Sequence, residues 1–362
     1  MRRFVLLFLL FLPLFPNSET EPIVTALVSE PRVSAQSYVL MDADTGKIWA
    51  AIKPDVRLPI ASTTKVMTAY VAIVLSEGDL SQKLTATDAH VRVEGSRMYL
   101  RAGESLTLEE LLYGLMLASG NDAALTIAEG LSGSVDAFVA EMNRMAQTLG
   151  LKDTHFTNPS GLPDDNHYST AQDMAKLMAV AMRDPTFAKI TGTREKVLTG
   201  RTVANHNRLL KTYAGLDGGK TGFTKAAGRC LITTAARNGR RLVVVTLNAP
   251  SDWKDHTALY DYGFSLYSEK LEFSKGTVPV SLHIVGSKTL TVPLYSEEEV
   301  SLTLTASEKQ ALKLIYYLPK FAYAPIDKNV PVGHITFMSE QRILATIKLY
   351  TAESAEYYTK SR

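Results

Sequence analysis

Cysteine is almost absent from this chain of 362 residues, which contains a single one, Cys230. One thiol cannot form an internal disulfide, so a disulfide-stapled scaffold is excluded and stability has to come from a hydrophobic core. Cys230 lies in an apolar segment, and we expect it to belong to that core rather than to act as a nucleophile.

An excess of charge of either sign is also lacking. The 39 basic and 37 acidic residues leave a formal net charge of +2 at pH 7. No basic tract interleaved with aromatic residues occurs, so nucleic acid is not an expected partner. The seven histidines show no pair at the spacing of metal ligands, and we predict no metal site and no cofactor.

The N-terminus carries a short apolar run behind two arginines. Residues 4–15 are apolar except for Pro13, which is typical of a secretory signal peptide. We predict a signal over residues 1–26, with cleavage between 20 and 35, and export to the extracytoplasmic face of the cell membrane, the cell wall or the periplasm. An uncleaved anchor is the weaker alternative, since about twenty apolar residues are usual for a membrane span.

The stretch from Leu58 to Tyr70 places a hydroxyl and an amine three residues apart at the start of an apolar helix. Pro59 suits a helix start, so we expect Ser62 in the first turn and Lys65 on the same face. A buried, neutral Lys65 could then accept the Ser62 proton. Ser-x-x-Lys alone is a weak signal, because a capping serine followed by a solvated lysine has the same spacing.

Two further motifs occur in contexts that suit catalysis. Ser119-Gly120-Asn121 falls between two predicted helices, the first of which opens with a capping box of Thr107 and Glu110. Lys220-Thr221-Gly222 precedes two apolar runs joined by Asn238-Gly239, which predicts an antiparallel hairpin with a type I′ turn. Each motif is weak by itself, but the joint occurrence of all three indicates function.

The three motifs resemble those of the penicillin-binding proteins and serine β-lactamases. Further stretches are similar to the low-molecular-mass penicillin-binding proteins that are serine-type D-alanyl-D-alanine carboxypeptidases, the peptidase S11 family. They are Tyr38 to Gly46, Asn158 to Leu162 with His167 to Ala171, and Asp217 to Gly222. The resemblance implies an α+β penicillin-binding-protein/β-lactamase-like transpeptidase fold, an antiparallel sheet flanked by helices, followed by a small β-rich domain.

By this resemblance the substrate is a peptidoglycan stem peptide, and the enzyme removes the last D-Ala of its D-Ala-D-Ala end through a serine acyl-enzyme. β-Lactam antibiotics would be covalent inhibitors. Ser62 would be the nucleophile and Lys65 its base. Ser119 would relay a proton to the leaving amine, and Asn121 would orient the lysine and the substrate amide.

The resemblance also implies a substrate-binding strand. Lys220 and the Thr221 hydroxyl would hold the terminal carboxylate, with Gly222 and Phe223 next along the strand. The backbone N–H groups of Ser62 and Phe223 would form the oxyanion hole. Some relatives have a histidine at the position of Phe223, a change that we expect to be tolerated because the position contributes its backbone.

The hydrophobic pattern of the chain changes after about residue 268. Alternating apolar residues predict strands over 278–284, 290–294, 300–304 and 343–349, and hence a catalytic domain over 36–268 and a small all-β domain over 269–351. Residues 352–362 are predicted to be a polar tail with no clear amphipathic anchor, which leaves peripheral membrane association open. For four aromatic residues of the second domain we favour core packing over an exposed contact patch: Tyr316, Tyr317, Phe321 and Tyr323.

Two alternative functions share these motifs. A β-lactamase needs fast deacylation, in one class through a glutamate-positioned water. The Pro- and Gly-rich segment 155–170 has only Asp164 and Asp165 as acids, which predicts slow release of bound penicillin. A non-catalytic wall-binding protein of the same fold is the other alternative. His155 and His167 flank this segment, and we expect them to make structural hydrogen bonds.

Overall fold

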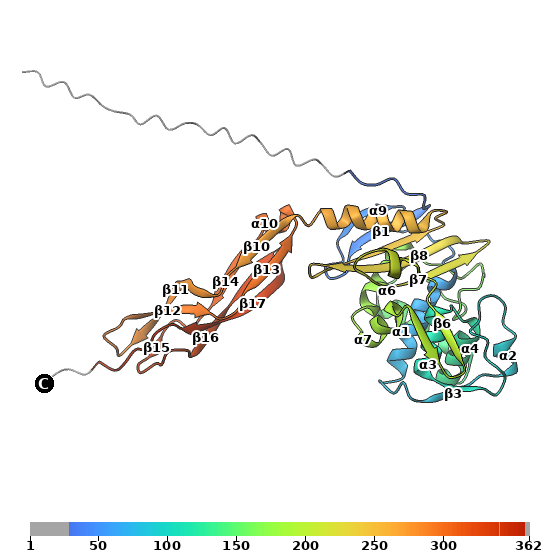
Figure 1. The fold of residues 1–362 in the computed structure, drawn as a ribbon, viewed down its shortest axis with the longest axis horizontal. Coiled ribbons are helices and arrows are strands. Elements are labelled where there is room, and N and C mark those ends of the chain that lie inside the picture. Colours follow the sequence, from blue (N-terminus) through green and yellow to red (C-terminus); the bar gives the residue numbers. More distant parts are fainter. Residues whose placement is uncertain (1–28, 340, 359–362) are drawn as a thin grey trace, which may run out of the picture.

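The computed structural model describes residues 29–339 and 341–358, so the predicted signal segment and the end of the predicted tail lie outside it. Figure 1 shows a larger body of helices and strands followed by a slender body of strands that extends away from it.

A five-stranded sheet in the order β2-β1-β9-β8-β7 forms the centre of the larger body. All of its neighbouring strands are antiparallel, as predicted. Asn238 and Gly239 both have positive φ, 50° and 73°, which the predicted type I′ turn between β8 and β9 requires. The strands are β1 (Ser37–Asp42), β2 (Ile48–Ile52), β7 (Leu216–Thr224), β8 (Gly228–Arg237) and β9 (Arg240–Leu247).

Both faces of this sheet are buried. Strands β1, β8 and β9 contribute to both cores, because alternate residues of a strand point to opposite sides. Val39 and Met41 of β1 enter the core beneath most of the helices. Tyr38 and Leu40 enter a second core on the other face, where α9 (Asp252–Ser265) packs, as Figure 1 shows. The sheet is therefore the middle layer of three.

The sequence analysis predicts the starts of two helices of the first core, and one of them begins as expected. Thr107 and Glu110 form the expected capping box of α3. The other is the nucleophile segment: Ala61–Thr64 is a 3-10 turn, η1, and the α-helix starts only at Lys65. The helices are α1 (Lys65–Leu75), α2 (Asp88–Val91), α3 (Leu108–Leu117), α4 (Asn121–Ser132), α5 (Val135–Thr148), α6 (Ala171–Ala181), α7 (Pro185–Gly192) and α8 (Leu209–Thr212).

Two small antiparallel pairs complete this body, β3 (Lys83–Thr85) with β4 (Ser105–Thr107) and β5 (Glu195–Leu198) with β6 (Arg201–Ala204). No single helix among the described residues is long and apolar enough to cross a membrane, although the bent pair of α4 and α5 has the length and composition.

The slender body has its own hydrophobic core. Strands occur at all four predicted places, and the structure adds four more strands and a short helix. The elements are β10 (Glu269–Phe273), β11 (Gly276–Val285), β12 (Thr291–Ser296), β13 (Val300–Leu304), α10 (Ala306–Gln310), β14 (Lys313–Tyr317), β15 (Ala322–Tyr323), β16 (Pro331–Ser339) and β17 (Arg342–Thr351).

The prediction that four aromatic residues of this body pack in its core is wrong for three of them. Tyr317, Phe321 and Tyr323 are 48%, 44% and 68% exposed, while Tyr316 packs partly buried against the core. The short strand β15 lies at an edge of the sheet, where side chains on the outer face meet no second layer. The segment after residue 351 also differs from a free polar tail, since Ala355 is buried and pairs with Ile326.

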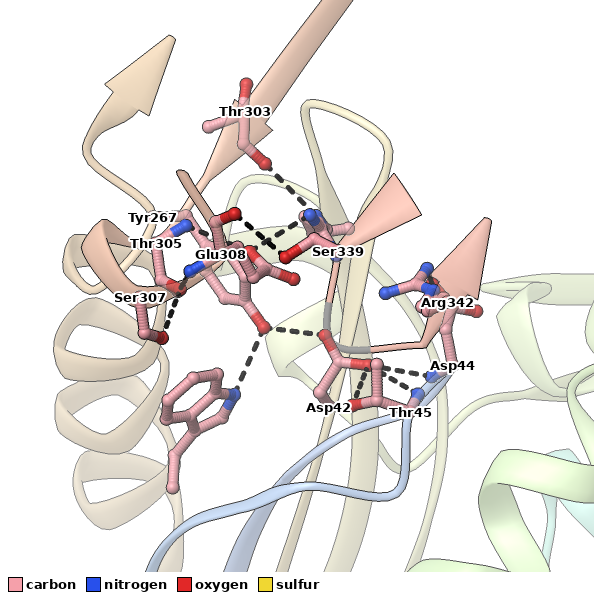
Figure 2. Close-up of polar contacts among 12 residues, drawn as sticks. Asp42, Asp44, Thr45, Tyr267, Thr303, Thr305, Ser307, Glu308, Ser339 and Arg342 are labelled. Atoms are coloured by element: carbon pink, nitrogen blue, oxygen red, sulfur yellow. Dashed lines mark hydrogen bonds and ion pairs between the residues drawn. The ribbon is translucent and has the colours of Figure 1, made fainter. Parts of the chain in front are cut away.

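The two bodies meet through buried polar groups. Arg240 of β9 donates to Thr303 O at 3.1 Å and to the Glu308 carboxylate at 3.1 Å, and both charged side chains are less than a tenth exposed. Figure 2 shows the neighbouring contacts, including the Tyr267 hydroxyl donating to Asp42 at 2.6 Å. A buried ion pair needs both partners in place, so these contacts fix where the second body attaches.

Candidate active site

Ser62 and Lys65 are brought together at the start of α1. Lys65 Nζ lies 2.9 Å from Ser62 Oγ, 2.7 Å from Asn121 Oδ1 and 2.6 Å from Ser160 O. The amine therefore has three partners from three segments of the chain. Two accept hydrogen bonds from it, which leaves its lone pair free to point at the Ser62 hydroxyl when it is neutral.

Lys65 is fully buried, and burial is the main cause that lowers its pKa well below the ordinary value. The nearby charge of Lys220 lowers the pKa further, while the charge of Asp122 opposes both effects. A lysine in this environment is poised to be neutral and to accept a proton. The structure therefore excludes the alternative that Lys65 is a solvated surface lysine.

Lys220 and Ser119 form a second hydrogen-bonded pair, across the site from Ser62 and Lys65. The Lys220 amine donates to Ser119 Oγ at 2.9 Å and to Thr221 O at 2.8 Å. Burial lowers the pKa of Lys220 to about 7. The three sequence motifs thus meet as two lysine–serine pairs, one at the junction of η1 and α1 and one between β7 and the loop before α4.

The backbone at this site is held in uncommon conformations. Ala61 and Ser119 have φ of 47° and 59°, in the left-handed region that non-glycine residues rarely adopt. A Cβ on Gly222 would come within 3.0 Å of Ser62 N, and one on Gly161 would come within 1.9 Å of Ala61 O. Both glycines allow a neighbouring segment to approach the serine turn, and such strain often marks a functional site.

A cavity of about 320 Å³ opens over these groups. Five of the eight predicted site residues line it, and the other three, Lys65, Asn121 and Lys220, lie buried behind it. The Phe223 side chain is 67% exposed, so it leaves the strand backbone accessible. The lining residues are Ser62, Ser96, Ser119, His206, Thr221, Gly222, Phe223, Arg229 and Trp253.

Four of these lining residues escaped the sequence reasoning, and Arg229 has the most chemical consequence. It lies opposite Phe223 in the β7–β8 pairing, so the hairpin register was the available signal. Its guanidinium donates to Asp252 at 2.9 Å and stacks over Trp253. Its Nε is buried without a partner among the described residues. The others missed are Ser96, His206 and Trp253.

The loop from residue 155 to 170 supports the site from behind. The Asn158 side-chain oxygen accepts from the backbone N–H groups of Ser160, Gly161 and Leu162. This arrangement holds the loop in the turn that aims Ser160 O at Lys65. The loop is therefore part of the environment of the base.

Both loop histidines make structural hydrogen bonds, as predicted. Buried His167 pairs with the Thr64 hydroxyl at 2.8 Å, and burial lowers its pKa to about 4. His155 pairs with Asn166 O at 2.7 Å. Cys230 is buried as predicted, and burial raises the pKa of its thiol to about 11. No group of metal-ligating side chains occurs among the described residues.

Two family models match the chain. One is described as D-alanyl-D-alanine carboxypeptidase and matches residues 24–251; the other is described as penicillin-binding protein 5, C-terminal domain, and matches residues 267–357.

Two curated relatives illustrate the likeness over most of the chain. The D-alanyl-D-alanine carboxypeptidase DacF of Bacillus subtilis is 33% identical over 88% of this chain and 85% of its own length. The D-alanyl-D-alanine carboxypeptidase DacA of Escherichia coli K12 is 33% identical over 89% of this chain and 84% of its own length.

Solved structures extend the likeness to three dimensions. Penicillin-binding protein 5 of Haemophilus influenzae is 30% identical, with a TM-score of 0.64 over 91% of this chain and 99% of that chain. A D-alanyl-D-alanine carboxypeptidase of Mycobacterium tuberculosis is 38% identical, with a TM-score of 0.64 over 68% of this chain and 96% of that chain.

Proposed function

The chain belongs to the D-alanyl-D-alanine carboxypeptidase family, the S11 peptidases, and on this basis we propose the role of each residue in the reaction. The protein is a serine-type carboxypeptidase of cell wall metabolism that acts on the D-Ala-D-Ala end of peptidoglycan stem peptides. The observation that carries the roles is the buried Lys65 amine, 2.9 Å from Ser62 Oγ.

Acylation begins when Ser62 Oγ attacks the carbonyl carbon of the penultimate D-Ala. The hydroxyl proton passes to Lys65 Nζ, which burial and Lys220 keep neutral. The developing oxyanion accepts hydrogen bonds from the backbone N–H groups of Ser62 and Phe223. Removing one such donor typically costs about 10²–10³ in rate.

Ser119 completes the step at the leaving group. Its hydroxyl accepts a hydrogen bond from Lys220. As the C–N bond breaks, Ser119 gives its proton to the amine nitrogen of the departing D-Ala and regains one from protonated Lys65, which becomes neutral again. Asn121 holds the Lys65 amine and orients the substrate amide. Water then attacks the ester carbonyl, and Ser62 leaves as the alcohol.

The terminal carboxylate is bound at the far side of the pocket. Lys220 and the Thr221 hydroxyl supply the first contacts, with Gly222 giving the backbone room to approach. Arg229 adds a guanidinium whose orientation is set by Asp252 and Trp253. Two cations facing one carboxylate explain a preference for a free C-terminus.

A β-lactamase activity is disfavoured by the same pocket. None of the residues that line the 320 Å³ cavity is an acid. Asp164 and Asp165 instead line a separate cavity behind the serine turn. Without a carboxylate to position water on the ester, we expect a penicillin adduct to persist. The complete set of proton-transfer residues argues against a non-catalytic wall-binding protein.

Mass spectrometry of penicillin-treated protein tests these roles. We expect one adduct on the tryptic peptide that contains Ser62, and D-Ala release from a diacetylated tripeptide ending in D-Ala-D-Ala. Ser62→Ala should abolish both signals while leaving the thermal unfolding transition in place. An adduct on another residue, or fast turnover of benzylpenicillin without an adduct, contradicts the assignment.

The substrate places the enzyme at the cell wall, outside the cytoplasm. We propose residues 1–26 as its export signal and a division near residue 268 between a catalytic domain and the β-rich domain. The two family-model ranges support that division.

We also propose peripheral contact with the membrane through one end of the β-rich domain. Tyr323 and Leu290 are 68% and 64% exposed there, and Tyr357 is 65% exposed. The pairing of β11 with β15 and of Ser287 with Tyr357 brings these side chains to one end of the domain, far from the catalytic body in Figure 1. Exposed aromatic rings of this kind favour the membrane interface.

Sedimentation with phosphatidylglycerol and phosphatidylethanolamine vesicles tests this contact. Leu290→Ser with Tyr323→Ser should reduce the bound fraction. Ile343→Ser, which removes a 59% exposed residue elsewhere in the same domain, should not. Equal binding by both variants, or no binding by the wild type, rejects the proposal.

A further inference from the structure

A second and larger cavity, of about 780 Å³, adjoins the catalytic pocket. The two cavities share Ser96 and His206 in their walls, so a ligand can extend from one into the other. One wall is the segment from Ser96 to Glu104, and the other is the β5–β6 hairpin. Cavities of this size hold ligands of several residues' bulk.

The lining of this larger cavity is cationic. It contains three arginines and one acid, Glu104. Glu104 is already paired with Arg201, and among the described residues neither Arg97 nor Arg101 has an acidic side chain within ion-pair distance. Arg97 stacks over Tyr99 and donates to Val91 O, and both arginines are exposed to solvent. The cavity therefore attracts an anionic group.

The wall of the cavity is tied to the catalytic loop by buried hydrogen bonds. The Asp122 carboxylate, which is fully buried, accepts from Met98 N at 2.9 Å and from Leu100 N at 3.0 Å. Asn121, whose side chain holds Lys65, donates its backbone N–H to Ser96 O at 2.8 Å. A ligand held by this wall is thereby placed at a fixed distance from Ser62.

Tyr99 gives this wall an unusual feature. Its φ is 64°, and its ring is 75% exposed at the edge of the cavity. A bulky residue with positive φ is strained and persists only where its surroundings hold it. Here the Asp122 carboxylate accepts hydrogen bonds from the N–H groups of Met98 and Leu100, the residues on either side of Tyr99. The Tyr99 ring is thereby presented beside the guanidinium groups of Arg97 and Arg101.

We propose that this cavity binds the part of the stem peptide that precedes D-Ala-D-Ala, and that Arg97 and Arg101 hold a free carboxylate of that part. The inference rests on the proposed function and adds a preference to it. Stem peptides carry carboxylates upstream of the scissile bond, on the glutamyl residue and on a diaminopimelyl residue, and both can be amidated. The enzyme should therefore distinguish acidic from amidated stems.

Matched synthetic pentapeptides test the proposal. One carries both upstream carboxylates, and two others have either the glutamyl or the diaminopimelyl carboxylate replaced by an amide. We expect kcat/KM to fall about tenfold for one of the amidated peptides, as for the loss of a charged hydrogen bond partly open to water. The amide that causes the fall identifies the carboxylate that is bound.

The ratio of kcat/KM for the acidic peptide to kcat/KM for that amidated peptide measures the preference. The variant Arg97→Gln with Arg101→Gln should reduce this ratio to about one. Arg144→Gln, at an exposed ion pair on α5, is the control and should keep the wild-type ratio. Both variants should hydrolyse the short diacetylated tripeptide within about twofold of the wild type, since it does not reach the cavity.

Two results overturn the inference: a wild-type ratio near one for both amidated peptides, or an unchanged ratio in the double variant. Failure of the proposed function is a different result. In that case the wild type neither releases D-Ala from the short tripeptide nor becomes labelled by penicillin.

Discussion

Replacing Lys65 by methionine is the most direct test of the proposed base. The amine contacts three oxygens, and the one on Ser62 is the proposed proton donor. Methionine fills a similar volume without a proton acceptor. A positioned general base typically contributes about 10²–10⁴ in rate, so we expect the rate of acylation by benzylpenicillin to fall by that factor.

Stability should change much less than the rate. The substitution leaves Asn121 Oδ1 and Ser160 O without their donor, which costs about 1–3 kcal/mol for each buried group. It also removes a buried amine, whose desolvation penalty opposes that loss. We therefore expect a net change of at most a few degrees in Tm. The variant should be folded, so its slower acylation should come from loss of the base and not from unfolding.

The assay is the pseudo-first-order rate of adduct formation, followed by mass spectrometry across pH 6 to 9. Lys65→Arg keeps a positive charge but cannot release a proton in this range, so it should be as slow as Lys65→Met. Lys176→Met, which removes a partly exposed lysine on α6 that does not line the pocket, should acylate at the wild-type rate. Acylation of Lys65→Met within tenfold of the wild type would refute Lys65 as the base.

Three further predictions follow from the geometry and the shifted pKa values. Gly222→Ala places a Cβ within 3.0 Å of Ser62 N, so it should lower kcat/KM for the short tripeptide at least about tenfold, as a displaced nucleophile requires; unchanged kinetics would show that the turn is not constrained. Lys220 has a folded pKa of about 7, so the unfolded chain binds a proton that the folded chain has released, and stability should rise from about pH 7 to about pH 10. Urea unfolding should show this rise in the wild type and a smaller one in Lys220→Met. Buried His256 has its pKa lowered to about 3 by burial, so stability should fall as pH decreases from about 6.5 towards 3, and His256→Gln should weaken that dependence in unfolding measured at several pH values.

Local patterns predicted most of the elements that position the site. The Thr107 capping box, the Asn238-Gly239 turn and the antiparallel strands around it all depend on residues close in sequence. The exposed aromatic residues of the second domain were misjudged, because periodicity does not reveal whether a strand lies at the edge of a sheet. Arg229 was missed because only its pairing opposite Phe223 brings it to the pocket.

The spacing of residues along the chain was enough to propose the nucleophile, its base and the two companion motifs, because each motif occupies one turn or one strand. Folding decided what these residues can do. The pKa of Lys65, the proposed base, is lowered because α1, the 155–170 loop and β7 bury the amine beside Lys220. Asp122 joins the catalytic loop to the wall of the large cavity through contacts between distant segments. Chemistry that depends on burial and on long-range contacts is set by packing, which no short stretch of sequence contains.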